Sequence, residues 1–139
     1  MASELKVDKF TGVTTAGSIL VTGEGNSTTT NLQQGLAKCW ATSNTEGSAV
    51  LDSFNLSSLG DTATGKETRN FTNNMASTAF SAIVDNTNNT VGNSNIYVHS
   101  VKTNHKNTTN FSSFLGYDPG TVTGVDADNQ SGLAHGDLA

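Results

Sequence analysis

Histidine and cysteine are the first candidates for chemistry in this sequence, because they supply bases, metal ligands and nucleophiles. His99, His105 and His135 lack the spacing of a metal site. Cys39 follows Lys38, but neighbours on a strand point to opposite faces, so the lysine is not placed to activate the thiol. We expect Cys39 to be a small buried apolar residue and the histidines to be solvated or packed.

Carboxylates are the next candidates, and they too lack a catalytic pattern. The run Asp126-Ala127-Asp128-Asn129 partly matches a calcium loop but lacks its central glycine and distal glutamate. We predict turn roles for Asp126 and Asp128, and the sequence leaves open whether an ion binds there. The twelve acidic residues are spread out, without a pair that marks a glycosidase. No serine nucleophile elbow, phosphate loop or zinc-protease motif occurs. We therefore predict that the protein is not an enzyme and has no cofactor.

The composition indicates which elements carry these residues. Only 34% of the 139 residues are hydrophobic and 14% are charged, against about 25% charged in a typical domain. Threonine favours strands, while the many Asn and Gly residues favour tight turns. The sequence therefore predicts an all-β fold of short strands joined by many turns.

Charge and hydropathy exclude several classes of partner. The net charge is −5, and the seven Lys and Arg residues are scattered, so we predict no nucleic-acid binding. No apolar run approaches the roughly 20 residues of a membrane helix, so we predict no membrane insertion. The start Met1–Glu4 has no basic or apolar secretory region, and the single cysteine allows no internal disulfide. We expect assembly in a cytoplasm.

Three segments are predicted. Residues 1–34 form an extended arm that contains too few apolar residues for a core, so we expect it to anchor or oligomerise the protein. Its anchoring residues are predicted to be Leu5, Val7, Phe10, Ile19 and Val21. Residues 35–126 form the folded domain, and residues 127–139 a polar C-terminal tail.

The folded domain is predicted to be an antiparallel β-sandwich, jelly-roll-like in form. Its apolar runs alternate with period two, as in Ala49–Leu59 and Ser94–Thr103, and turn signals separate them. The predicted core residues are Leu36, Trp40, Val50, Phe54, Leu56, Phe71, Phe80, Val84, Ile96 and Val98.

Several segments in a fixed order carry a resemblance. They are GLAKCW from Gly35, DSFNLSSLGD from Asp52 and TRNFTNNM from Thr68. Together they resemble a module of tail-fibre-like structural proteins of bacteriophages, especially marine ones, over residues 35–84. SELKVDKF at residues 3–10 resembles the opening of such proteins. The resemblance implies a β-sandwich-like, often trimeric building block of virion appendages, with no catalytic residues. The family usually has a smaller residue at the position of Cys39 and longer stems.

From the resemblance we expect a non-catalytic virion structural protein. The short stem favours a capsid decoration protein, a knob or short head fibre, that is held by its arm, forms a homotrimer and contacts other virion proteins. One alternative is a tail fibre or fibre adaptor that contacts the host surface, with a surface glycan as partner. Another is a carbohydrate-binding module using Trp40, Tyr97 or Tyr117, although the apolar strand around Trp40 favours a core position for that residue.

Overall fold

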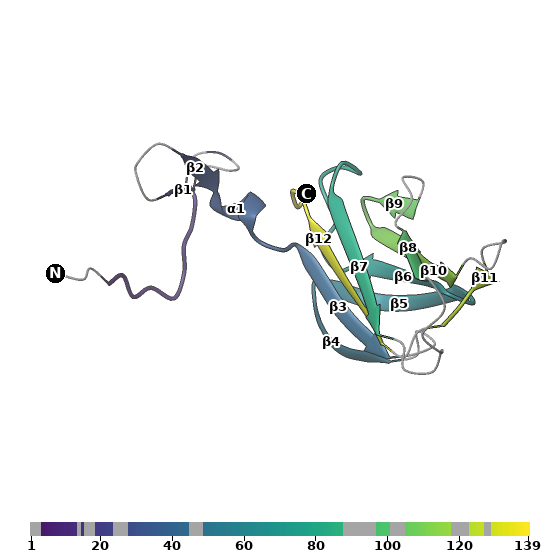
Figure 1. Ribbon diagram of the computed structural model, residues 1–139. Coiled ribbons are helices and arrows are strands. Elements are labelled where there is room, and N and C mark those ends of the chain that lie inside the picture. Colours follow the sequence, from purple (N-terminus) through teal and green to yellow (C-terminus); the bar gives the residue numbers. More distant parts are fainter. Residues whose placement is uncertain are drawn as a thin grey trace. The chain divides into compact units, whose positions relative to one another are not determined.

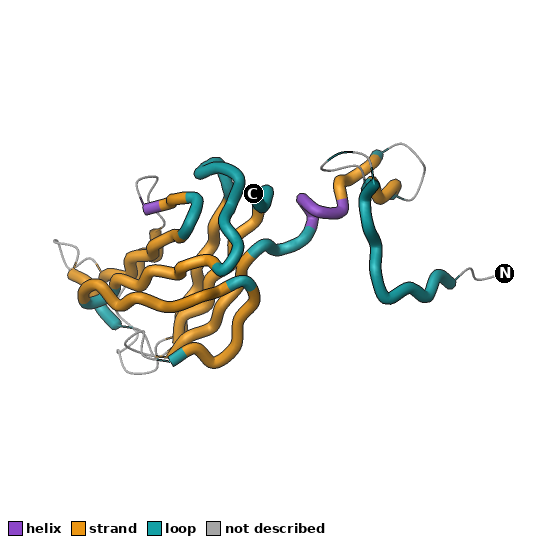
Figure 2. Tube along the Cα trace, turned by 180° about the vertical axis from the view of Figure 1, so that it is seen from behind, coloured by secondary structure: helices purple, strands orange, loops and turns teal. Residues whose placement is uncertain are grey.

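The computed structural model describes residues 4–13, 15, 19–23, 28–44, 49–87, 97–100, 105–117, 123–126 and 129–139. The chain divides into two compact units, Met1–Leu36 and Ala37–Ala139. The described strands are all antiparallel, and a single helical turn accompanies them (Figures 1 and 2).

The first unit has little regular structure. Residues 4–13 form no helix or strand. Strand β1 (Leu20–Thr22) pairs with β2 (Thr29–Asn31), and the single turn α1 (Leu32–Gly35) follows directly. The Asn31 side chain accepts a hydrogen bond from the Gln33 N–H at 2.8 Å, which is how asparagine caps the start of a helix.

The second unit is an antiparallel β-sandwich, as the sequence predicts (Figure 1). One sheet has the order β4-β3-β12-β7, with bounds Val50–Phe54, Cys39–Asn44, Asn129–His135 and Ser81–Thr87. The other has the order β11-β10-β6-β5, with bounds Thr123–Gly124, Asn110–Tyr117, Lys66–Phe71 and Leu56–Ala63. Strands β8 (Tyr97–Ser100) and β9 (Lys106–Asn107) also pair with β10.

The predicted polar tail is wrong for most of its length. Asn129–His135 forms β12, which pairs with β3 on one side and with β7 on the other. The strand contains few large apolar residues, so its sequence resembles a tail. Its backbone groups are nevertheless satisfied on both edges, and a strand between two partners needs no strong intrinsic propensity.

The chain passes from one sheet to the other at Asn55. The period-two pattern predicts one strand over Ala49–Leu59, but β4 ends at Phe54 and β5 begins at Leu56. Asn55 has φ 57°, a left-handed conformation that asparagine tolerates better than most residues. Its Nδ2 donates to the Lys38 carbonyl at 2.8 Å, and its Oδ1 accepts the Asn73 N–H at 2.7 Å. These contacts stabilise the corner where the two sheets meet.

The core between the sheets is aromatic. Phe71, Phe80 and Phe111 are buried and form three ring pairs with centroids 5.8 to 6.3 Å apart. Cys39 and Met75 complete the same cluster together with Ala134. Edge-to-face and tilted ring pairs add stability beyond the burial of their area.

Candidate functional site

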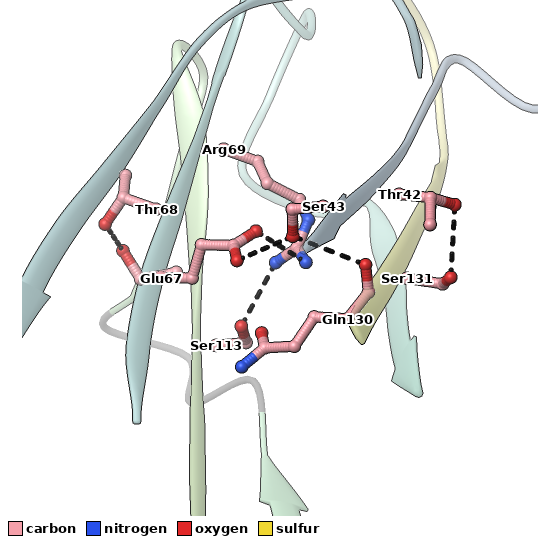
Figure 3. Close-up of polar contacts among 9 residues, drawn as sticks. Thr42, Ser43, Glu67, Thr68, Arg69, Ser113, Gln130 and Ser131 are labelled. Atoms are coloured by element: carbon pink, nitrogen blue, oxygen red, sulfur yellow. Dashed lines mark hydrogen bonds and ion pairs between the residues drawn. The ribbon is translucent and has the colours of Figure 1, made fainter. Parts of the chain in front are cut away.

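A buried polar cluster joins the two sheets (Figure 3). Arg69 Nη2 lies 2.7 Å from Glu67 Oε1, and both side chains are almost fully buried. Arg69 Nη1 donates to Ser113 Oγ at 3.1 Å, and Ser43 Oγ donates to Glu67 Oε2 at 2.8 Å. Since Ser43 belongs to β3 and the other residues to β6 and β10, the cluster connects one sheet to the other.

The sequence of β6 explains why these charges lie inside. Burial alternates along Lys66–Phe71, so Glu67, Arg69 and Phe71 all face inward. Gly132 on β12 leaves the space for the guanidinium, because a Cβ at that position would lie 2.5 Å from Arg69 Nε. The Arg69 Cζ also lies 5.5 Å from the centroid of the Phe111 ring, at a distance that permits a cation–π contact.

The electrostatics of this cluster disfavour nucleophilic chemistry. Burial raises the pKa of the Cys39 thiol to about 11, against the opposing charge of Arg69. Burial lowers the pKa of Arg69, and the negative charge of Glu67 works against that shift. A thiol with this pKa is protonated at neutral pH, whereas the thiolate is the reactive form. The Cys39 thiol is therefore not activated as a nucleophile by this cluster.

The opposite face of the four-stranded sheet carries a row of large apolar side chains. The strand register places Phe54 beside Trp40, Trp40 beside Leu133, and Leu133 beside Ile83. Directly paired residues share one face of a sheet, so these four form a continuous apolar row across all four strands. Phe54 is 52% and Ile83 63% exposed, while Trp40 and Leu133 are partly exposed.

A polar row runs parallel to the apolar row, two residues away along each strand. Thr42 pairs with Asp52 and with Ser131, and Ser131 pairs with Asp85. Thr42 Oγ1 and Ser131 Oγ lie 3.2 Å apart (Figure 3). A depression of about 260 Å³ lies over the parts of both rows on β3, β12 and β7, and not over their ends on β4. The residues that line it are Trp40, Ala41, Thr42, Ile83, Asp85, Ser131, Gly132 and Leu133.

The predicted anchoring residues lie in the first unit and are open to solvent. Leu5, Val7, Phe10 and Val21 are exposed, and Ile19 is partly buried. The structure therefore leaves four of these five apolar side chains uncovered.

The predicted core residues divide between the two faces. Phe71 and Phe80 lie in the core, Val84 packs against it, and Leu56 is partly buried. The prediction is wrong for Leu36, Val50 and Phe54, which are exposed, and Trp40 faces outward on β3. It assumed that large apolar residues face inward, whereas Cys39, Ala41 and Ser43 form the inner face of β3. Ile96 and the side chain of Val98 lie outside the described residues.

The other candidate groups of the sequence are Asp126, Asp128 and the histidines. Asp126 accepts a hydrogen bond from the Gly65 N–H at 2.7 Å, and Asp128 lies outside the described residues. His105 and His135 are partly buried. Within the described ranges no group of three or more His, Cys, Asp or Glu residues could hold a metal ion, and no helix is long and apolar enough to cross a membrane.

Neither the buried ion pair nor the apolar row was predicted from the sequence. The alternation in KETRNF was a usable signal for the ion pair, since it places Glu67 and Arg69 on the face of Phe71. The apolar row had no such signal, because it depends on strand register.

Comparisons with known proteins find no matching family model, curated protein or solved structure.

Proposed function

We propose that this chain is a non-catalytic structural protein of a bacteriophage particle, and that its first unit attaches the β-sandwich to that particle. The observation that carries the proposal is the exposure of apolar side chains in the first unit. Leu5 is 73%, Phe10 61% and Val13 89% exposed. Covering such side chains with a partner surface stabilises the complex by about 25 cal/mol for each Å² of apolar area.

The hairpin of the first unit gives a second reason. Strands β1 and β2 pair over three residues each, and an isolated two-stranded hairpin is only marginally stable in water. None of the side chains described in residues 4–36 is buried. A segment of this kind gains order when another protein covers it. Other virion proteins and further copies of this chain are the partners we propose.

The phage assignment has separate support. The segments Gly35–Trp40, Asp52–Asp61 and Thr68–Met75 resemble those of phage appendage proteins. A β-sandwich with few charges suits a repeated building block, since its surface can be covered with little desolvation of ions. The proposed role is decoration of the particle as a homotrimer, with the virion as its location.

Incorporation into particles tests this proposal. A full-length variant with Leu5→Ser, Val7→Ser and Phe10→Ser should keep the circular dichroism spectrum of the wild type but be lost from purified phage particles, measured by quantitative mass spectrometry. The matched control carries Val50→Ser, Leu51→Ser and Leu138→Ser, which are exposed residues of the second unit. The control should be incorporated normally. Incorporation of the first variant at wild-type copy number, or absence of the wild-type protein from particles, would contradict the proposal.

The oligomeric state has its own test. Sedimentation equilibrium of the full chain should give three times the chain mass of 14.4 kDa. A monomer at micromolar concentration would count against the trimer.

A further inference from the structure

The outer face of the four-stranded sheet combines two kinds of surface within one depression. The apolar row supplies an aromatic side chain, Trp40, next to Leu133 and Ile83. The polar row supplies two hydroxyls, from Thr42 and Ser131, at 3.2 Å from one another. Small-molecule sites typically combine a mostly apolar lining with a few polar groups that orient the ligand. The two rows meet that description.

The charge of this face restricts the kind of ligand that can bind in the depression. The four strands contain two aspartates, Asp52 and Asp85, and neither lysine nor arginine. Each aspartate pairs with a hydroxyl residue at one end of the polar row; Asp85 lines the depression, whereas Asp52 lies outside its lining and accepts the Ser53 N–H at 2.8 Å. Carboxylates accept hydroxyl hydrogen bonds strongly and repel anions. The face therefore suits a ligand that is rich in hydroxyl donors and carries no negative charge.

We propose that this depression binds one sugar residue of a neutral glycan. The ring of a pyranose has an apolar C–H face, which would lie against Trp40, and hydroxyls along its edge, which would donate to the polar row. A volume of about 260 Å³ matches a single sugar residue better than a longer ligand. The inference is independent of the phage proposal, since binding is a property of the purified protein.

The affinity for one sugar residue follows from its size. A ligand of about a dozen non-hydrogen atoms at modest efficiency per atom has a dissociation constant on the order of 1 mM. Several copies on one assembly would bind a polymeric glycan far more tightly through multivalency.

Trp40 is the only tryptophan of the chain and lies in the proposed site, so its fluorescence reports binding directly. The neutral probes are N-acetylglucosamine and the methyl glycosides of glucose, galactose and mannose. Glucuronate serves as the anionic counterpart. We expect at least one neutral sugar to change the Trp40 emission saturably and glucuronate to leave it unchanged. Absence of a saturable change with every neutral sugar, or tighter binding of glucuronate, would overturn the proposal.

Variants locate the site. Asp85→Asn should weaken binding at least threefold, and Ile83→Ala should weaken it by a smaller factor. Asp61→Asn is the matched control, because Asp61 is an exposed aspartate on β5 of the other sheet. It should bind like the wild type. Equal loss in Asp61→Asn and Asp85→Asn would contradict a site on this face.

A Trp40→Leu variant separates sugar binding from self-association. Saturation-transfer NMR should show at least a tenfold loss of binding to the best sugar, while circular dichroism and sedimentation stay unchanged. If the variant instead has a smaller oligomer mass than the wild type, the apolar row is a contact between copies, and the glycan proposal is wrong.

Discussion

The two faces of the four-stranded sheet differ in the size of their side chains, and the larger apolar side chains lie on the outer face. The inner faces of β3 and β12 carry small residues, among them Cys39, Ala41, Gly132 and Ala134. The outer face carries the apolar row of Phe54, Trp40, Leu133 and Ile83. Antiparallel sheets that face water on one side usually show large apolar residues inside and polar residues outside.

The opposite sheet explains this difference. It projects Phe71, Phe111 and the long Arg69 side chain into the space between the sheets. The four-stranded sheet must therefore carry small side chains at the positions that face these residues, because protein interiors are close-packed. The outer row contributes little to that packing, so a reason for its size has to be sought in binding.

Glu67→Ala should cause the largest loss of stability. It leaves the buried Arg69 guanidinium without its carboxylate partner, which costs about 3–5 kcal/mol of unfolding free energy. Urea unfolding followed by circular dichroism measures the loss. The double variant Glu67→Leu with Arg69→Met should recover most of the stability, because it removes both charges. A single variant as stable as the wild type would show that the pair does not contribute to packing.

Gly132→Ala should cause the next largest loss of unfolding free energy. Its Cβ would lie 2.5 Å from Arg69 Nε and 2.8 Å from Cζ, and the ion pair to Glu67 restricts how far the arginine can move. Overpacking of this kind costs about 1–3 kcal/mol. The matched control is Gly60→Ala on β5, where the nearest atom would be 3.8 Å away, and its unfolding free energy should change by about 0.5 kcal/mol or less. Similar losses in both variants would contradict the tight fit at Gly132.

The Cys39 thiol should make stability fall at high pH. Its pKa rises from 9.0 to about 11 on folding, so between these values the folded state keeps a proton that the unfolded state has lost. Unfolding free energy then decreases with rising pH, by at most about 1.4 kcal/mol for each pH unit from this group.

Urea unfolding at pH 8, 9, 10 and 11 measures that dependence. Cys39→Ala should show a shallower decline over the same range, since the other titrating groups are unchanged. Parallel declines in the two proteins would show that the thiol is not shielded as described.

The outer row should matter least for stability. Ile83→Thr and Val84→Thr make similar changes at neighbouring positions of β7, where Ile83 is exposed and Val84 packs against the core. Ile83→Thr should lower the unfolding free energy by about 1 kcal/mol or less. Val84→Thr should lower it by about 1–3 kcal/mol, because only this substitution buries a hydroxyl. Thermal unfolding compares them. A larger loss for Ile83→Thr would mean that the outer row is covered in the folded protein.

Part of this arrangement could be predicted from particular residues. Phe80 and Val84 were predicted as core residues, and Phe80 lies in the core while Val84 packs against it. The burial of Cys39 was expected and is confirmed. Trp40 and Phe54 were placed on the wrong face, and Val50 was expected in the core but is exposed. Alternation separates the two faces of a strand but does not say which one is buried. On β3 and β4 the larger side chains lie on the outer face, so predicting the buried face from side-chain size chose the wrong face.

The all-β class follows from the composition, because threonine favours strands while asparagine and glycine favour turns. That Glu67, Arg69 and Phe71 share a face follows from the alternation of their positions, which is a local property of a strand. Strand pairing in the folded chain makes Asn129–His135 a central strand and makes the apolar row continuous. Both depend on pairing between residues far apart in the chain, which local propensity does not encode.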